Sequence, residues 1–150
     1  MVNQTTIEIV KSTVPLLKKH GQQITARMYE ILFQNHPEVR AKFDMAAQAD
    51  GSQSAKLATA VYSYASKIDN LSTLKSMVER IGHRHVQTHV LPEEYPIVGE
   101  SLLQAMKDIL KESATEEVMA AWTEAYQALS EVFINREHEI YEEQKSLCVS

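Results

Sequence analysis

Apolar residues recur every three or four positions along most of this chain, which is the spacing of amphipathic helices. The pattern predicts an orthogonal bundle of helices joined by short connections, although the periodicity alone does not distinguish one bundle topology from another. The predicted helices cover approximately residues 5–21, 22–35, 37–43, 53–68, 72–89 and 92–109, and a last and longest one begins near residue 115.

Capping and helix-breaking residues set the predicted helix boundaries. Thr5 and Glu8 have the spacing of a capping box at the start of the first helix, and Gly21 should end that helix. Pro15 has no backbone N–H, so we expect it to bend the helix or to remove one hydrogen bond. Thr115 is the expected N-cap of the last helix.

Two interruptions are expected between the second and fourth helices. The pair His36–Pro37 forces a break, after which a short helix begins at Pro37. The stretch from Asp44 to Ser52 is made of small and polar residues, so we interpret it as a loop.

Two polar residues stand where the helical spacing calls for apolar ones. His85 follows Ile81 on the inner stripe of its helix, so its ring should point into the core. Gln53 begins the stripe of its own helix, one turn before Leu57. A histidine on an apolar stripe is usually a hydrogen-bonded core residue, but neutral imidazole is also the commonest metal-binding side chain. Spacing alone favours the core interpretation for His85 and leaves a metal or haem ligand as the alternative.

Glu137 presents a similar choice. It lies about 20° from Tyr126 around the last helix, on the margin of the buried face. A buried carboxylate is costly unless a partner neutralises or hydrogen-bonds it. Spacing alone favours a solvated side chain near a fraying helix end. The alternative is an acceptor that holds the His85 ring and raises its basicity.

A zinc site is a third interpretation of the histidines, since His85 and His89 are one helical turn apart and His83 is close by. Zinc requires a third and usually a fourth ligand, and the single cysteine, Cys148, lies in the C-terminal tail. We therefore interpret His83 and His89 as surface residues.

Composition limits the classes of function. A chain of 150 residues has the size of one domain that can enclose a small cofactor. Its formal net charge of -5 argues against nucleic acid as a partner, because phosphates require a basic face. We find no signal peptide and no apolar run long enough to span a membrane, and one cysteine cannot form an internal disulfide. We therefore expect a single domain, residues 1–150, located in the cytoplasm.

Four segments of the chain carry a family resemblance: Val14-Pro15-Leu16-Leu17, His36-Pro37-Glu38-Val39-Arg40 through Phe43-Asp44-Met45, Ile68-Asp69-Asn70-Leu71 and Glu94-Tyr95-Pro96-Ile97-Val98-Gly99. With them the chain resembles bacterial single-domain haemoglobins of the Vitreoscilla type and the globin domain of flavohaemoglobins. The resemblance extends from about Thr5 to Tyr141. It implies an all-α globin fold, a 3-on-3 helical sandwich, with haem b (iron protoporphyrin IX) between the helices that carry Gln53 and His85.

The resemblance also implies roles for individual residues. His85 matches the proximal ligand of the iron, and Tyr95 and Glu137 match the two residues that hydrogen-bond around it. Tyr29 and Gln53 match the distal pair that hydrogen-bonds the gas ligand. The residues implied to contact the haem are Phe43, Leu57, Val61, Ile81, Arg84, Tyr95, Val98 and Leu102. Among them Arg84 could pair with a haem propionate, and Arg80 is a second candidate for that pairing.

Two departures from the family pattern are visible. In the run Gln53-Ser54-Ala55-Lys56-Leu57 the basic residue stands one position later than is usual in the family, so the start of this helix is in question. Nothing follows Ser150, so we expect no flavin- and nicotinamide-binding domains of the kind that flavohaemoglobins carry.

The resemblance implies a protein that reversibly binds oxygen, for capture and delivery at low aeration. The alternative is nitric oxide dioxygenation, which yields nitrate, and either this or a peroxidase-like activity would need a separate flavin/NAD(P)H reductase as partner. A distal phenol or amide stabilises negative charge on a bound diatomic gas, whereas a carboxylate behind the proximal histidine favours redox chemistry. The oligomeric state stays open between monomer and homodimer.

Overall fold

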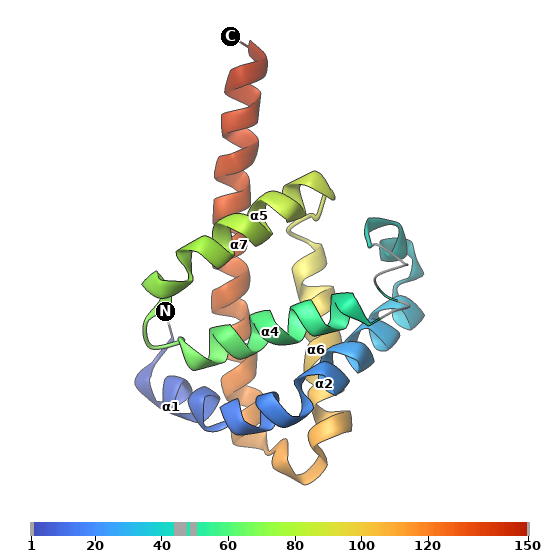
Figure 1. Cartoon of the computed structure of the whole chain (residues 1–150), viewed down its shortest axis with the longest axis vertical. Helices are drawn as coiled ribbons and strands as arrows, with labels where there is room; N and C mark the ends of the chain where they lie inside the picture. Colours follow the sequence, from blue (N-terminus) through green and yellow to red (C-terminus); the bar gives the residue numbers. More distant parts are fainter. Residues whose placement is uncertain (1, 44–47, 49–50, 150) are drawn as a thin grey trace.

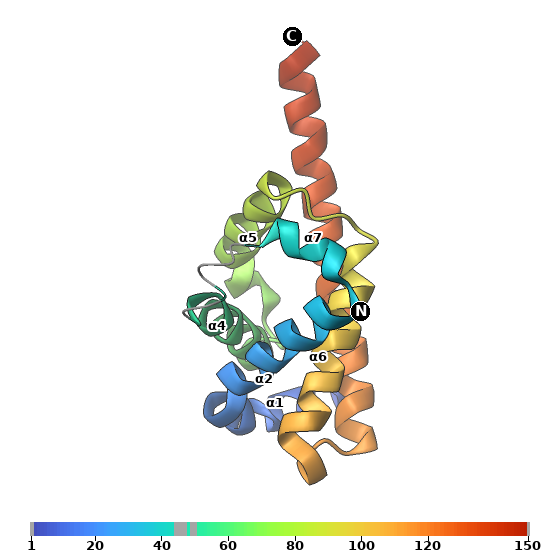
Figure 2. The same cartoon turned by 90° about the vertical axis from the view of Figure 1, so that its right-hand side faces the viewer.

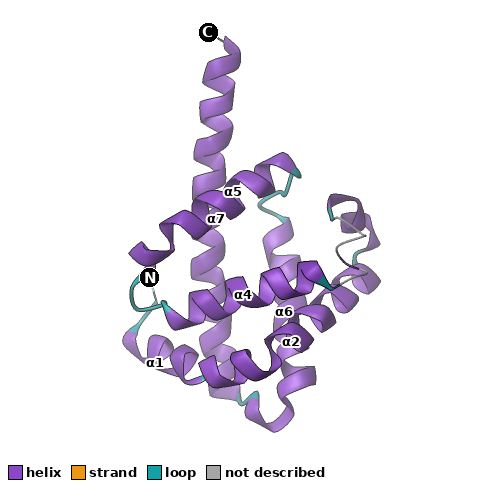
Figure 3. Ribbon diagram, viewed as in Figure 1, coloured by secondary structure: helices purple, strands orange, loops and turns teal. Residues whose placement is uncertain are grey.

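The computed structural model describes residues 2–43, 48 and 51–149, and every regular element within those ranges is helical (Figures 1 and 3). The elements are α1 (Gln4–Ser12), α2 (Val14–Asn35), η1 (Pro37–Lys42), α4 (Ser52–Ser66), η2 (Leu71–Leu74), α5 (Lys75–Gln87), α6 (Glu94–Leu110), η3 (Lys111–Ser113) and α7 (Glu116–Val149), where η denotes a 3-10 helix. The predicted all-α fold is confirmed. Most of the loop predicted from Asp44 to Ser52 lies outside the described residues, although Gln48 is helical and Ser52 already begins α4.

The N-terminal boundary differs from the prediction. The Asn3 side chain accepts a hydrogen bond from the Thr6 N–H at 2.8 Å and so caps α1, and the capping box predicted at Thr5 is wrong. The predicted helix is interrupted at Thr13 and does not bend at Pro15. Pro15 occupies the first turn of α2, where a backbone N–H has no partner within the helix, so the proline removes no hydrogen bond.

Gly21 does not end a helix. It lies inside α2, which runs without interruption to Asn35, so the predicted boundary at this residue is wrong. A Cβ on Gly21 would stand 3.5 Å from the Cβ of Ala58 in α4, so two small residues meet where α2 crosses α4. The glycine therefore serves packing between helices and not helix termination.

The core forms where α2 packs against α4 and α6, and where α7 packs against α1 and α5 (Figures 1 and 2). Trp122 of α7 is buried in it and donates from Nε1 to the hydroxyl of Thr13 at 3.1 Å. The hydroxyl of Tyr64 in α4 donates to the carbonyl oxygen of Ala125 at 2.7 Å, and burial raises the pKa of this phenol to about 12. The polar atoms of these large side chains thus find partners inside the core.

The second half of the chain follows the predicted helices closely. The helix predicted over 72–89 is a 3-10 turn, η2, followed by α5, and the next helix, α6, begins at Glu94. Between them His89 adopts a φ of 60°, and Lys42 of η1 donates to its carbonyl oxygen at 2.9 Å and pairs with Glu94 at 2.7 Å.

The last helix, α7, begins as predicted, with the Thr115 hydroxyl accepting from the Val118 N–H at 3.2 Å. It continues well past Glu137 and projects beyond the other helices at its C-terminal end (Figures 1 and 2). Glu137 is therefore not near a fraying end. No helix in the described ranges combines the length and the apolar composition that crossing a membrane requires.

Candidate functional site

Three helices bring His85, Tyr95 and Glu137 into direct contact. The Nδ1 atom of His85, on α5, lies 2.8 Å from the Tyr95 hydroxyl of α6 and 3.0 Å from Oε2 of Glu137 on α7. The Tyr95 hydroxyl lies 2.7 Å from Oε2 and 2.9 Å from Oε1 of the same carboxylate. The structure therefore groups all three residues that the resemblance places on the proximal side.

The chemistry of these contacts determines which atoms carry protons. A carboxylate has no donor, so the Tyr95 O–H and the His85 Nδ1–H both donate to Glu137. With its proton on Nδ1, the neutral His85 ring has a free lone pair on Nε2, which hydrogen-bonds no described residue. The Nε2 atom is thus available as a metal ligand.

Burial explains why the carboxylate needs both donors. Glu137 is only 4 % exposed, so interpreting it as a solvated side chain is wrong. Burial, followed by the neighbouring Glu137 carboxylate, raises the pKa of Tyr95, so the phenol remains protonated and able to donate. A buried carboxylate with two charge-assisted hydrogen bonds is satisfied in the way that its environment requires.

Tyr126 of α7 contacts the backbone at the start of α6, where Tyr95 lies. Its hydroxyl donates to the Tyr95 carbonyl oxygen at 2.7 Å, and its ring lies against Gly99. A Cβ on Gly99 would stand 2.6 Å from Cε2 of Tyr126, closer than side chains approach one another. Only glycine at this position lets the Tyr126 ring reach the backbone of Tyr95.

The predicted distal pair is also in contact. Tyr29, on α2, is 5 % exposed, and the Gln53 amide on the first turn of α4 donates to its hydroxyl at 3.4 Å. The Tyr29 ring packs edge-on against Phe43 at 5.5 Å between centroids. Burial raises the pKa of Tyr29, and the nearby side-chain amides of Gln53 and Gln48 oppose the rise without cancelling it.

Gln48 is a polar neighbour of Tyr29 that sequence reasoning missed. Its amide nitrogen is buried and has no hydrogen-bond partner within the parts of the chain that the structure describes. A buried amide that lacks a partner is costly, so its N–H groups are available to a polar ligand near the Tyr29 hydroxyl. No periodicity connects Gln48 to a helix face, so the sequence contains no signal that marks it.

The apolar residues implied to contact the haem are incompletely buried. Phe43, Leu57, Val61, Ile81 and Val98 all keep part of their surface exposed, and Leu102 is the buried exception. The helices that carry them have other packing partners: α4 packs against α2, and α5 packs against α7. Burial of these side chains against a flat apolar group would remove that surface from water.

The basic residues implied to contact the haem propionates lie at the surface. Arg84 and Arg80 are exposed and form no ion pair with a described residue. Both line an open depression along α5, together with Lys75, Ser76, Glu79, His83 and Gln87. One charged helix face does not enclose an apolar cofactor, so this depression is not the candidate site. The described residues hold no cluster of three or more His, Cys, Asp or Glu placed to bind a metal ion.

Comparison with known proteins identifies the class to which this fold and site belong. A family model described as globin matches residues 26–133, so the chain belongs to the globin family, whose members bind haem.

Its similarity to particular globins is close. It is 42% identical over 146 residues to the flavohemoprotein of Oceanobacillus iheyensis, covering 97% of this chain but 36% of that protein, and 48% identical over 143 residues to that of Bacillus anthracis, covering 95% and 35%. The chain therefore spans about a third of these relatives.

Solved structures give the same result at nearly full coverage. A bacterial globin from Campylobacter jejuni superposes with a TM-score of 0.89 at 36% identity, covering 93% of this chain and 99% of that one. An engineered carbene transferase, a putative nitric oxide dioxygenase from Rhodothermus marinus, superposes with a TM-score of 0.90 at 34% identity, covering 97% and 99%. The predicted globin fold and the resemblance to flavohaemoglobin-type globins are confirmed.

The residues present fit the haem that the family implies. The His85 ring offers Nε2 as a ligand, and a buried amide nitrogen on Gln48 lacks a partner among the described residues. The apolar side chains Phe43, Leu57, Val61, Ile81 and Val98 are incompletely buried. These are the donor, the polar contact and the surface that an iron porphyrin with a gas ligand requires.

The contact between Gly99 and Tyr126 gives the first prediction. Gly99→Ala should lower the free energy of unfolding by about 1–3 kcal/mol, because the new Cβ overlaps the Tyr126 ring. Thermal or denaturant unfolding measures this. Gly82→Ala is the matched control: its Cβ would make contacts of 3.7 Å and longer, so this variant should keep or slightly gain stability. Equal stabilities for the two variants would contradict the prediction.

Proposed function

We propose that this chain is an oxygen-binding haem protein in which Nε2 of His85 binds the iron of haem b. The observation that carries the proposal is the contact of His85 Nδ1 with Glu137 and Tyr95, which leaves Nε2 as the free ring nitrogen. Haem supplies an iron atom that binds diatomic gases reversibly and exchanges one electron. The proposal rests on the site geometry together with membership of the globin family.

On the proximal side, neighbouring residues orient the His85 ring and increase the electron density on its Nε2 atom. Glu137 accepts a hydrogen bond from the Nδ1–H of His85, which fixes the ring tautomer and increases electron density on Nε2. Tyr95 donates to the other side of the carboxylate and so fixes its position. The Tyr126 hydrogen bond to the Tyr95 backbone secures this arrangement from α7.

On the distal side the Tyr29 hydroxyl is the proposed donor to a diatomic gas. The Gln53 amide donates to this hydroxyl, which leaves the hydroxyl proton free to point at a ligand. Because Tyr29 is buried, its hydrogen bond to a ligand with partial negative charge forms in a medium of low dielectric constant and is strengthened there. The role of Arg84 as partner of a propionate belongs to the same proposal, as do the apolar contacts.

The carboxylate behind His85 favours a second candidate function, the dioxygenation of nitric oxide. In this reaction nitric oxide, dioxygen and one electron yield one nitrate ion. An imidazole supported by a carboxylate favours redox chemistry over storage, and the similar globins include a putative nitric oxide dioxygenase. The electron would come from a separate flavin/NAD(P)H reductase. Nitric oxide consumption measured with and without such a reductase distinguishes this activity from oxygen delivery.

The first test of haem binding is His85→Ala. Loss of the Nε2 ligand should abolish tight haem retention, because none of the described residues that contact His85 in this site is a second histidine. The absorption spectrum and haem content of the purified protein measure it. The control is His83→Ala on the same helix, whose ring pairs with Glu79 and should be dispensable. Full haem content in His85→Ala, without added imidazole, would refute the assignment.

The distal proposal predicts faster oxygen release from Tyr29→Phe. Loss of a charge-assisted hydrogen bond worth roughly 1.5–3 kcal/mol should raise the dissociation rate about ten- to a hundredfold. Stopped-flow measurement reads this rate directly. Tyr62→Phe removes a hydroxyl from a half-buried position on α4 and should leave the rate unchanged. A wild-type rate in Tyr29→Phe would transfer the role to Gln53 or Gln48.

The proximal proposal predicts that Glu137→Gln weakens electron donation from His85. A neutral amide is a poorer acceptor of the Nδ1 proton than a carboxylate, so the iron–histidine stretch of the ferrous deoxy protein should fall in frequency and the haem should become easier to reduce. Tyr95→Phe should give a smaller change of the same sign. Resonance Raman and a redox titration measure the two quantities. Wild-type values with only a lower melting temperature would make Glu137 a structural residue.

A further inference from the structure

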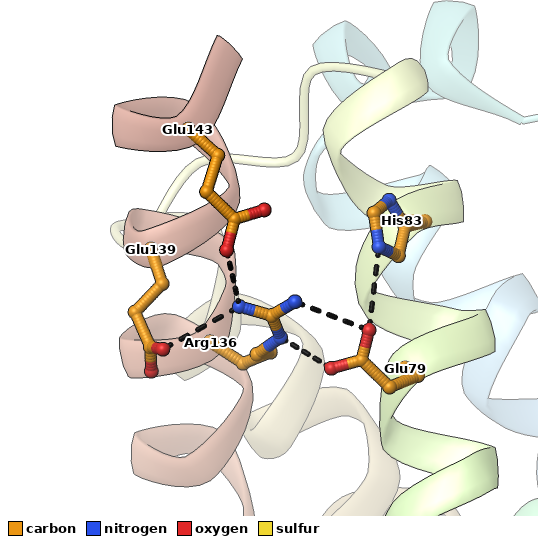
Figure 4. Close-up of polar contacts among 5 residues, drawn as sticks. All are labelled: Glu79, His83, Arg136, Glu139 and Glu143. Carbon is orange, nitrogen blue, oxygen red and sulfur yellow. Dashed lines mark hydrogen bonds and ion pairs between the residues drawn. The ribbon is translucent and has the colours of Figure 1, made fainter. Parts of the chain in front are cut away.

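A second polar cluster lies on α5 and α7, centred on Arg136 (Figure 4). The guanidinium contacts both carboxylate oxygens of Glu79 on α5, through Nε to Oε1 and through Nη2 to Oε2 at 3.2 Å. From Nη1 it reaches Glu143 at 3.2 Å and Glu139 at 3.4 Å, both on α7 itself. Nε2 of His83 lies 3.3 Å from Oε2 of Glu79. Among the contacts of this cluster, only the one between Arg136 and Glu79 connects the two helices.

This contact and the His85–Glu137 hydrogen bond flank one line of close packing, the α5–α7 seam. At the seam Gly82 of α5 faces α7 at van der Waals distance: a Cβ there would stand 3.7 Å from Cδ1 of Ile140, 3.8 Å from Cγ of Arg136 and 4.0 Å from Cγ of Glu137. The side chains of Arg136 and Glu137 leave α7 on the two sides of this line. One reaches Glu79 and the other reaches His85.

Two such contacts on opposite sides of a seam determine how α7 is rotated about its own axis. Consecutive residues project about 100° apart around a helix, so Arg136 and Glu137 cannot move independently when α7 turns. The glycine at the seam offers no side chain to oppose a rotation. The ion pair with Glu79 therefore adds a directional constraint to the apolar packing of Phe133 against His85 and of Ile140 near Gly82.

The geometry of the ion pair between Arg136 and Glu79 is better suited to fixing the orientation of α7 than to stabilising the fold. Exposed ion pairs contribute little to stability, and Glu79 is 48% exposed. The Arg136 side chain is only 21% exposed, however, and its fork binds the carboxylate through two nitrogen atoms, which fixes orientation as well as distance. Hydrogen bonds to Glu79 and Glu143 raise the pKa of Arg136, and the hydrogen bond from Arg136 lowers the pKa of Glu79, so both groups are charged at neutral pH.

We propose that Arg136 and Glu79 are positioning residues for the proximal histidine: their ion pair sets the rotation of α7 on α5 and with it the hydrogen bond from His85 to Glu137. This inference rests on the proposed haem function. When the ion pair is broken, Glu137 moves relative to Nδ1 of His85, and the strength of the iron–histidine bond changes although neither His85 nor Glu137 has been altered.

The test compares variants of the haem-loaded protein by resonance Raman of the ferrous deoxy form and by redox titration. Glu79→Gln and Arg136→Met should each lower the iron–histidine stretch, by less than Glu137→Gln does, and make the haem easier to reduce. The double variant should equal either single one, because both break the same contact. Arg136→Lys, which keeps the charge without the fork, should lie between wild type and Arg136→Met.

Two controls separate position from charge. Glu139→Gln removes a carboxylate that also binds Arg136 but lies on α7, and it should leave both readouts unchanged. A purely electrostatic effect on the haem would move the reduction potential in opposite directions for Glu79→Gln and Arg136→Met, since one removes a negative and the other a positive charge. Displacement of Glu137 moves it in the same direction for both.

The outcomes discriminate between this inference and the function on which it rests. Wild-type stretches in Glu79→Gln and Arg136→Met, with a shift in Glu137→Gln, would overturn the positioning role alone. So would equal shifts in Glu79→Gln and Glu139→Gln, or opposite changes of potential in the two single variants. A wild-type stretch in Glu137→Gln would refute the proximal role of Glu137 itself and this inference with it.

Discussion

The requirement that a buried carboxylate be hydrogen-bonded organises the proximal half of this molecule. Glu137 lies inside the protein, where an unpaired negative charge would be strongly destabilising. Its partners come from sites 42 and 52 residues earlier, Tyr95 and His85, so three helices must meet at one carboxylate. The arrangement that satisfies this charge also fixes the proton on one nitrogen of an imidazole and leaves the other nitrogen free.

The longest helix, α7, is the element on which this arrangement is built. Trp122 anchors it to the junction of α1 and α2, Tyr126 reaches the backbone of α6, and the next turns carry the residues that meet α5. Because these residues all belong to one helix, a displacement of α7 at any one of these contacts also displaces the others. The N-terminal and proximal regions are thereby coupled through packing.

Periodicity and helix-breaking residues were sufficient to predict the helices, but not all of their ends. Asn3 and not Thr5 caps α1, because the Asn3 side chain is the one that accepts a hydrogen bond from the first turn. Gly21 lies inside a helix, at the place where α4 crosses α2 and two small residues meet. For Glu137 the helical period gave its angle but not its partners, which lie far away in the sequence. Its role, and those of Tyr29 and Gln53, followed from family resemblance.

Gln48 marks the limit of both kinds of reasoning. Neither period nor resemblance singled it out, because its environment arises only from the fold that brings it to Tyr29. A polar atom that finds no partner among the described residues can be recognised only when the surroundings that exclude water from it are known.

The Lys42 side chain connects two segments that the chain separates widely. It contacts the His89 carbonyl and the Glu94 carboxylate, 47 and 52 residues later. His89 holds a backbone conformation that non-glycine residues seldom adopt, and the turn between α5 and α6 is held both by the Val90 N–H bond to the His85 carbonyl oxygen at 2.9 Å and by these outside contacts. Because Lys42 contacts the turn at two points, we expect η1, which leads to Phe43, and the turn, which leads to Tyr95, to open together. Amide hydrogen exchange in both segments would then report a single opening event at this edge of the protein.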